Sequence, residues 1–277
     1  MSGDGQKVTD KRCQEPLFGR TKGVRDEELT KRWLTKRCQE PMFDMMFFRS
    51  DDWGMGRPKR AATGGLIYHV LNRANARMTI FENDADFEAF ETVLSEAVER
   101  TKMRLLSYCV MPNHWHLVVW PKKDGQLSEF TGWLTLTHTQ RWHAHRHSAG
   151  SGHVYQGRFK SFPVQSDQHF YTVCRYVERN PLRANLVSSA DLWRWSSVYR
   201  WRHGTAAEKK LLSAWPLPRK PSWLNHVNEP LTEREYEAVK RCVQRGRPFG
   251  DDNWASRKIK LLGLQSTVTP RGRPRTQ

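Results

Sequence analysis

Strand-like patterns occur at several places between residues 66 and 162 of this chain. Apolar and β-branched residues alternate over residues 66–73, which predicts a first strand. The apolar and aromatic run over residues 104–120 is broken at Pro112-Asn113, so it predicts two neighbouring strands separated by a turn. Residues 154–162 predict a further short strand or hairpin.

Helical patterns separate and follow these strands. From Asn83 onward, apolar residues recur at three- and four-residue steps, and Asn83 with the acidic residues after it is typical of a helix start. A second helix is predicted over about residues 127–144. A third is predicted over about residues 166–180, where it should close because Pro181 pushes the residue before it out of α geometry.

The order of these elements predicts a fold class. The predicted order is β-α-β-β-α-β-α. This is the order of a ferredoxin-like α+β domain with an antiparallel sheet. We expect the helices to cover one face of that sheet and to leave the other face open to a ligand.

The N-terminal segment differs from the rest of the chain. Residues 1–54 are polar and mixed in charge, and the sequence of residues 11–18 recurs with one substitution at residues 36–43. Two copies are too few for a repeat architecture, so we expect a largely disordered extension. One hypothesis is that it is translated repetitive DNA upstream of a true start at Met55.

The amino-acid composition also changes toward the C-terminus. Residues 55–200 are expected to form the main domain, and residues 201–230, which are rich in Pro, Trp and Lys, a linker. Residues 231–277 predict a basic extension with helices over about 231–245 and 251–262. Its tail, 270–275, has an extended Arg-Gly-Arg-Pro core that could lie in a DNA minor groove, the alternative being a solubilising tail.

Charge changes the picture by indicating a partner. Forty-six Lys and Arg residues face 29 Asp and Glu, a formal net charge of +17, and the chain holds 12 Trp. Basic side chains release counterions from phosphates, and aromatic rings stack on unpaired bases, so nucleic acid is the expected partner. The alternatives are a merely soluble basic protein or one bound to an anionic membrane surface.

Cysteine usage and hydropathy indicate a compartment. Five scattered cysteines show no Cys-x-x-Cys spacing, which suits a reducing cytoplasm better than a disulfide scaffold. No apolar run approaches the roughly 18 residues of a membrane span, so we expect no membrane partner. A cytoplasmic, nucleoid-associated protein is the resulting expectation.

The candidate chemistry starts at His114 and His116. Side chains two apart on a strand point to the same face, so these imidazoles should project together while Trp115 packs on the opposite face. Two imidazoles on a rigid strand can supply two of the ligands of a metal site. The alternative is a structural or surface pair on an exposed sheet face.

The helix before Pro181 offers the missing groups. Tyr176 and Asn180 lie at i and i+4, on one helical face. Tyr176 is a candidate nucleophile, and the amide oxygen of Asn180 is a candidate third ligand. Oxygen beside imidazole suits Mg²⁺ or Mn²⁺ acting on phosphate. Tyr176 could instead be a core residue, and three other tyrosines compete on chemistry alone: Tyr108, Tyr155 and Tyr171.

These motifs together carry a family resemblance. The segment from Gly65 to about Arg200 resembles the single-tyrosine transposases of the HUH superfamily and is especially similar to their REP-associated, bacterial branch. The resemblance rests on four blocks in this order: Tyr68-His69-Val70-Leu71-Asn72-Arg73, Met111-Pro112-Asn113-His114-Trp115-His116, Gly157-Arg158-Phe159, and Tyr176-Val177-Glu178-Arg179-Asn180-Pro181.

The resemblance implies roles for individual residues. His114, His116 and Asn180 match the ligands of a divalent metal, Mg²⁺ or Mn²⁺, and Tyr176 matches the nucleophile. The implied reaction cleaves single-stranded DNA, giving a 5′-phosphotyrosine and a free 3′-hydroxyl, and rejoins the strand. The substrates that the resemblance implies are imperfect hairpins formed by repetitive extragenic palindromes. The implied protein is a monomer or a homodimer.

Basic residues near the four blocks are candidate DNA contacts, although each taken alone could be a solvated charge. They are Arg73, Arg77, Arg158, Lys160 and Arg183. Two alternatives to a strand transferase stay open at this point: a non-catalytic regulator that binds hairpin DNA, and a replication-initiator or relaxase-type nickase with the same core.

Overall fold

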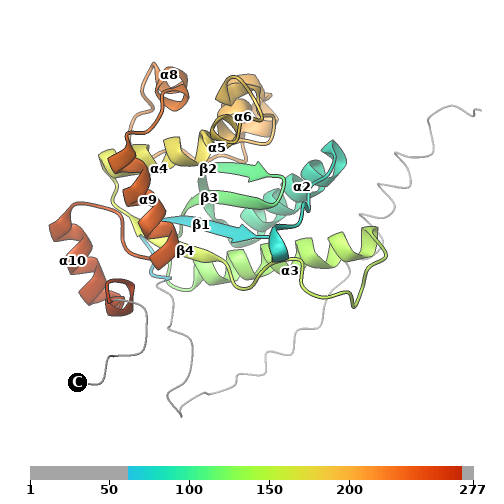
Figure 1. Ribbon diagram of the computed structural model, residues 1–277, viewed down its shortest axis with the longest axis horizontal. Helices are drawn as coiled ribbons and strands as arrows, with labels where there is room; N and C mark the ends of the chain where they lie inside the picture. The colour runs from blue at the N-terminus through green and yellow to red at the C-terminus, as the bar shows by residue number, and fades with distance from the viewer. Residues whose placement is uncertain (1–61, 270–277) are drawn as a thin grey trace, which may run out of the picture. The chain divides into compact units, whose positions relative to one another are not determined.

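A four-stranded antiparallel sheet forms the centre of the computed structural model, which describes residues 62–269 (Figure 1). The strands are β1 (Ile67–Arg73), β2 (Arg104–Met111), β3 (His114–Trp120) and β4 (Lys160–Val164). Their order across the sheet is β2-β3-β1-β4, with every neighbouring pair antiparallel. With one helix after β1 and one after β3, this is the ferredoxin-like arrangement, so the predicted α+β class is confirmed. The predictions for residues 1–54 and for the tail 270–275 lie outside the described residues.

The helices lie close to their predicted ranges. Asn83 caps α2 by accepting a hydrogen bond from the Asp86 backbone N–H at 3.2 Å. The predicted third helix ends at Glu178, and Asn180 begins a separate short helix with Pro181 in its first turn. The α-helices are α2 (Asp84–Thr101), α3 (Gln126–His145), α4 (Gln168–Glu178), α5 (Asn180–Arg183), α6 (Ser197–His203), α7 (Ala206–Lys209), α8 (Trp223–Asn228), α9 (Glu233–Arg245) and α10 (Asp252–Leu261).

Hydrophobic cores lie on both faces of the sheet, which corrects the expectation that helices cover only one. On one face, Trp115 packs with the apolar residues of α2 and α3, as predicted for that side chain. On the other face, α4 packs against β2 and β3. The physical reason is visible in β2, where seven of the eight residues are buried. A strand that is apolar on both sides needs cover on both sides.

Residues 201–230, whose composition predicts a linker, carry the short helices α7 and α8 and contribute to the second core. Trp223 is fully buried, and its indole N–H donates to Glu178 Oε2 at 2.7 Å. Glu178 also accepts hydrogen bonds from the hydroxyls of Ser197, at 2.6 Å, and Ser107, at 3.2 Å. This buried carboxylate therefore joins α4 to β2, α6 and α8, between Tyr176 and Asn180 in the sequence.

Substitution of Trp223 should destabilise the whole domain. Trp223→Ala removes a fully buried indole and is expected to cost about 3–5 kcal/mol of unfolding free energy. Trp223→Phe keeps most of the volume but leaves a buried carboxylate oxygen without its donor, which costs about 1–3 kcal/mol. Urea unfolding of the full chain measures both. Trp201→Ala, at a partly exposed tryptophan on α6, is the control and should lie within about 1 kcal/mol of the wild type. Equal losses in all three variants would contradict this account.

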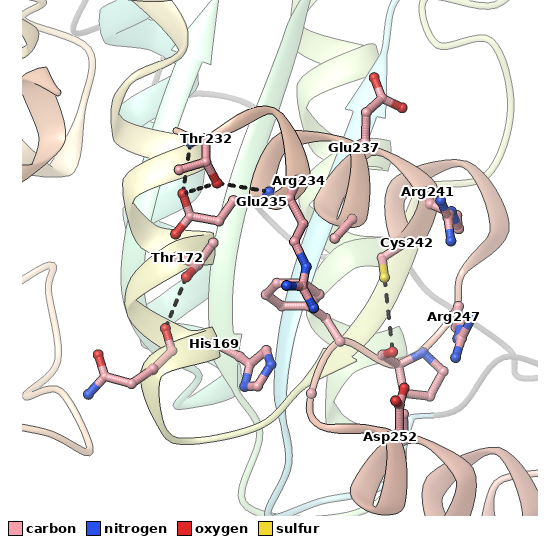
Figure 2. A pocket seen from close by; sticks show the side chains of 16 residues that line it. His169, Thr172, Thr232, Arg234, Glu235, Glu237, Arg241, Cys242, Arg247 and Asp252 are labelled. Atoms are coloured by element: carbon pink, nitrogen blue, oxygen red, sulfur yellow. Dashed lines mark hydrogen bonds between the residues drawn. The ribbon is translucent and has the colours of Figure 1, made fainter. Parts of the chain in front are cut away.

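The C-terminal helices pack on the domain. α9 contacts α4 and β4, and Figure 1 shows it lying beside α4. Thr232 begins α9 with a capping box to Glu235. Between α9 and α10, Phe249 forms a parallel bridge with Val164, so this segment extends the edge of the sheet at β4. The hollow that it closes against α4 is drawn in Figure 2.

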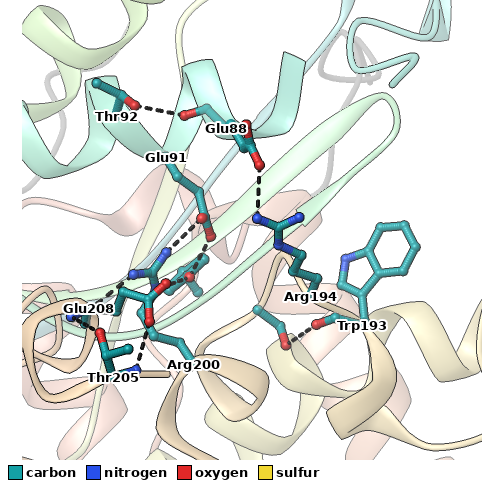
Figure 3. A network of polar contacts seen from close by, with 10 residues as sticks. Glu88, Glu91, Thr92, Trp193, Arg194, Arg200, Thr205 and Glu208 are labelled. Carbon is teal, nitrogen blue, oxygen red and sulfur yellow. Dashed lines mark hydrogen bonds and ion pairs between the residues drawn. The ribbon is translucent and has the colours of Figure 1, made fainter. Parts of the chain in front are cut away.

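A polar network ties α2 to the segment around α6 (Figure 3). Arg200 donates to Glu91 Oε2 at 2.6 Å and to the Tyr108 hydroxyl at 2.6 Å, and Tyr108 donates to Glu91 Oε1 at 2.6 Å. Arg194 reaches Glu88 at 2.8 Å. Burial raises the pKa of Tyr108 well above its usual value, with the Glu91 carboxylate acting in the same direction. The Tyr108 hydroxyl is thus a structural group.

Candidate active site

Two imidazoles from β3 lie side by side on the face that α4 covers. His114 is paired across the sheet with Arg73 and Met111, and His116 with Leu71 and Cys109. Directly opposite residues share a face, and Cys109 and Met111 belong to the core under α4. The ring centroids of His114 and His116 are 5.0 Å apart. The structure therefore brings together the two histidines that the alternation predicted to share a face.

Hydrogen bonds orient both rings. Asn113 donates from Nδ2 to the Arg77 carbonyl, which turns its Oδ1 toward His114 Nδ1 at 2.6 Å. Because that oxygen can only accept, His114 carries its proton on Nδ1 and has a lone pair on Nε2. His116 Nδ1 lies 2.9 Å from Nε2 of His69, on the neighbouring strand β1. His69 lies within one of the sequence blocks, but no role in the site was predicted for it.

The electrostatic environment keeps these rings neutral at neutral pH. Burial lowers the pKa of His69 to about 3. Burial, with Arg73 and Arg183 nearby, lowers the pKa of His114 to about 3 as well. The pKa of His116 is lowered well below its usual value, chiefly by burial. A neutral imidazole offers a lone pair, which a protonated one does not.

Tyr176 projects from α4 toward the imidazoles. Its ring centroid is 5.7 Å from that of His116 and 6.2 Å from that of His69. Its hydroxyl forms no hydrogen bond within residues 62–269. A fully enclosed hydroxyl without a partner would be an unsatisfied buried atom, and among the side-chain N and O atoms of these residues only Arg219 Nη1 is one. The Tyr176 hydroxyl therefore keeps contact with solvent. Burial raises its pKa, and the Arg183 charge opposes that rise.

Asn180 lies at the start of α5 with its amide held in one orientation. Its Nδ2 donates to the Tyr176 carbonyl at 3.0 Å and to the Val177 carbonyl at 3.3 Å. Its Oδ1 accepts from Arg183 Nη2 at 2.8 Å. An amide oxygen has two lone pairs, so one stays open for a further partner. Arg183 is close enough to lower the pKa of both His114 and His116.

Helix α9 adds two residues that sequence reasoning missed. Tyr236 lies with its ring centroid 6.3 Å from that of Tyr176, and its hydroxyl accepts from Arg183 Nη1 at 3.2 Å. Lys240 lies 5.4 Å from the Tyr236 ring centroid and opposes the rise in the pKa of Tyr176. No local signal in the sequence identifies this pair, because it is about 60 residues away from Tyr176.

The competing tyrosines lie elsewhere. Tyr108 and Tyr155 belong to the core on the opposite face of the sheet. The Tyr155 hydroxyl is bonded to His138 at 2.8 Å and to Trp115 at 3.0 Å. Tyr171 is on α4, but its hydroxyl donates to the Pro218 carbonyl at 2.6 Å. Of these four tyrosines, Tyr176 alone reaches the imidazole pair.

The five predicted DNA contacts fall into three groups. Arg73, at the end of β1, and Arg183, on α5, adjoin the imidazoles and Tyr176. Lys160 begins β4, the edge strand. It is paired with Leu71 of β1, which is in turn paired with His116 of β3. Arg77, in the short 3₁₀-helix after β1 (Asn75–Arg77), and Arg158, in a loop, are exposed. Within residues 62–269, neither forms a hydrogen bond, ion pair or ring contact with the imidazoles or with Tyr176. Their roles stay a prediction.

The two imidazoles offer nitrogen donors of the type that a divalent cation binds. Nε2 of His114 has an open lone pair, and His116 Nε2 has one when its proton is on Nδ1 and His69 accepts. Within residues 62–269, no group of three or more His, Cys, Asp or Glu side chains is placed to hold a metal ion. Two imidazoles alone leave the remaining positions to oxygen donors such as the Asn180 amide, water or a phosphate.

The fold and site define a class of protein: a ferredoxin-like sheet with an imidazole pair under a helix that presents a phenol. Comparison with known families agrees, because residues 62–180 match the family model described as IS200-like transposase.

Two solved structures are also similar to this chain. One is described as a REP-associated tyrosine transposase bound to a REP hairpin; it has 15% identity and a TM-score of 0.42, covering 65% of this chain and 100% of its own. The other is a proposed transposase from Deinococcus radiodurans R1, with 15% identity and a TM-score of 0.32, covering 47% of this chain and 92% of its own. No curated protein matches the sequence. Within the described residues, no helix is long and apolar enough to cross a membrane.

Proposed function

We propose that this protein cleaves and rejoins single-stranded DNA, with Tyr176 as the nucleophile. The observation that carries the proposal is the approach of the Tyr176 ring to His116, with 5.7 Å between centroids, from a helix more than 50 residues away in the sequence. An imidazole pair and a phenol facing one another, with arginines beside them, form a site suited to a phosphodiester.

The reaction balances without an external energy source. The Tyr176 oxygen forms a bond to phosphorus, the bond from phosphorus to the 3′-oxygen breaks, and the phenolic proton is lost to solvent while the leaving oxygen gains one. The products are a 5′-phosphotyrosine and a free 3′-hydroxyl. Attack by another 3′-hydroxyl reverses these steps, rejoins the strand and releases Tyr176. Arg183 and Arg73 favour the ionised phenol electrostatically, against its burial.

A divalent cation completes this proposal. His114, His116 and Asn180 would hold Mg²⁺ or Mn²⁺, which when bound neutralises charge on the scissile phosphate. His69 would act as a positioning residue: its Nε2 lies 2.9 Å from His116 Nδ1, and by accepting that proton it would leave the lone pair of His116 Nε2 free for the cation.

Substitution of His69 tests that positioning role. His69→Ala removes the acceptor and should weaken Mn²⁺ binding by about 10–100-fold. His69→Gln keeps an acceptor oxygen and should retain more of the affinity. Electron paramagnetic resonance of free Mn²⁺ measures binding without any reaction. If His69→Gln loses as much affinity as His69→Ala, the hydrogen bond is not what orients His116.

The substrate is proposed from the sequence blocks. Their similarity to the REP-associated branch indicates single-stranded DNA beside an imperfect hairpin. Incubation of an end-labelled hairpin oligonucleotide with the full chain and Mn²⁺ should yield an adduct that survives denaturation, together with a fragment ending in a 3′-hydroxyl. Binding without any adduct would reject catalysis and support the non-catalytic regulator. Adduct formation without strand joining would support a nickase of the initiator or relaxase type.

A further inference from the structure

A hollow of about 770 Å³ lies beside α9 (Figure 2). Its walls are the first turns of α4, helix α9 and the segment leading into α10. We name it the arginine pocket after Arg234, Arg241 and Arg247, which line it. Its floor includes the buried side chains of Cys242 and Phe249.

In the part of the chain that the structure describes, the arginines of the pocket are not paired with the carboxylates that line it. Within residues 62–269, Arg234, Arg241 and Arg247 form no recorded ion pair or hydrogen bond. Three carboxylates also line the pocket. Glu235 accepts from Thr232 at 2.9 Å, and Glu237 accepts from Lys240 at 2.6 Å. Asp252, exposed in the first turn of α10, forms no ion pair with the three arginines within residues 62–269. Figure 2 shows Arg234 directed into the hollow, with Arg241 and Arg247 together on one side of it. Three guanidinium groups therefore face a concave surface and lack the anion that they usually bind.

The walls are held in place before any ligand binds. Phe249 donates to the Pro163 carbonyl and accepts from the Gln165 backbone N–H, both at 2.9 Å, along the edge of β4. A Cβ at Gly250 would collide with Gln165 and Trp254, so the segment is tightly packed there. The His169 ring stands edge-on to the Phe249 ring, with 5.0 Å between centroids. A preformed pocket spends little free energy on ordering when it binds.

The arginine pocket adjoins the proposed catalytic site through two shared helices. Thr172 of α4 lines the pocket, and Tyr176 follows it by one turn, a rise of about 6 Å. On α9, Arg234 and Arg241 line the pocket, while Tyr236 approaches Tyr176. A strand bound at Tyr176 thus lies about one helical turn from a residue that lines the pocket.

We propose that the arginine pocket binds the phosphate backbone of the DNA strand a few nucleotides from the bond that Tyr176 cleaves. The inference rests on the proposed function, which it extends to a second binding site. Guanidinium forks match phosphate oxygens in pairs, and contacts to the backbone hold a strand in register without reading its bases. The pocket accordingly acts on affinity and placement for any sequence.

The test measures affinity for a labelled oligo-dT strand over a range of NaCl concentrations. It uses the full chain carrying Tyr176→Phe, so that no cleavage takes place. Adding Arg241→Gln and Arg247→Gln should weaken binding roughly ten-fold. The magnitude of the slope of log K against log salt should fall by about 1.4. Each phosphate of a single strand that a cation neutralises contributes about 0.7 to that slope, and the double variant removes two cations. Arg241→Lys with Arg247→Lys keeps both charges and should retain most of the slope. The thermal midpoint of each variant reports whether it is folded.

A matched control removes the same charge elsewhere. Arg257→Gln with Lys260→Gln removes two exposed charges of α10 that do not line the pocket, and should change the slope much less. Equal losses in the two pairs would show an effect of net charge alone and overturn the proposal, as would an unchanged slope in the pocket pair. Stabilisation by inorganic phosphate that depends on Arg241 and Arg247, with DNA affinity unaffected by their loss, would assign a free-anion site and also overturn it. This test measures binding without cleavage, so it is independent of the catalytic proposal. The catalytic proposal would fail in a different experiment, in which the unsubstituted chain forms no adduct with DNA.

Discussion

Replacement of Tyr176 by phenylalanine is expected to abolish the covalent protein–DNA adduct and leave DNA binding unchanged. The substitution removes only the hydroxyl, which forms no hydrogen bond within the described residues and keeps contact with solvent. No buried partner is left unsatisfied, so the thermal midpoint should stay close to that of the wild type. Without a nucleophile, adduct formation should fall by at least about 10³-fold. Denaturing gels with a labelled hairpin oligonucleotide measure the adduct, and a fluorescence titration measures affinity.

Two other tyrosines are the controls for this experiment. Tyr171→Phe changes a phenol on the same helix whose hydroxyl is bonded to the Pro218 carbonyl, and the adduct should persist. Tyr236→Phe changes the phenol nearest to Tyr176 and removes an acceptor of Arg183. If the adduct survives Tyr176→Phe and disappears with Tyr236→Phe, the nucleophile is on α9, and the proposed role of Tyr176 is wrong.

Loss of His114 or His116 should impair metal binding and cleavage together. Each imidazole is proposed to supply one ligand bond, so alanine at either position should weaken Mn²⁺ affinity by more than the roughly 10–100-fold expected for an orienting residue. Cleavage at saturating DNA should fall about 10²–10³-fold, the scale for removing one preorganised electrostatic interaction at a reacting group. Paramagnetic resonance of free Mn²⁺ follows binding, and adduct formation against Mn²⁺ concentration follows activity.

His203→Ala serves as the control for the histidine variants. His203 is an exposed residue on α6 whose only recorded ion pair, within residues 62–269, is with Asp191 at 3.7 Å. Its loss should leave the Mn²⁺ dependence unchanged. If His114→Ala cleaves with the same dependence on Mn²⁺ as the wild type, His114 is not a ligand. A drop in activity with full Mn²⁺ binding would instead indicate that His114 contacts DNA.

Much of the site can be predicted from local spacing. The period of two on a strand is enough to put His114 and His116 on one face and Trp115 on the other, and the structure confirms that arrangement. The i, i+4 spacing also links Tyr176 with Asn180, although their helix is interrupted between them and the amide of Asn180 bonds back to the Tyr176 carbonyl. Their assignment as nucleophile and third ligand stays a prediction.

Other parts of the site have no local signal. His69 becomes an orienting group because β1 pairs with β3, which places it beside His116. Tyr236 and Arg183 meet because α9 packs on α4. Residues 201–230 look like a linker by composition, yet Trp223 is buried there because Glu178 and the second core lie next to α8. Each contact joins segments that are distant in the sequence.

The sequence by itself determined the antiparallel α+β class, the order of the strands and of the longer helices α2, α3, α4, α9 and α10, and the pairing of two imidazoles on one strand. These follow from the repeat of side-chain direction within a single element, which depends only on near neighbours. The tertiary structure alone decided that helices cover both faces, that Tyr176 rather than Tyr108, Tyr155 or Tyr171 approaches the imidazoles, and that α9 closes the site. Such choices depend on which apolar faces bury each other, and that is settled by packing between elements far apart along the chain.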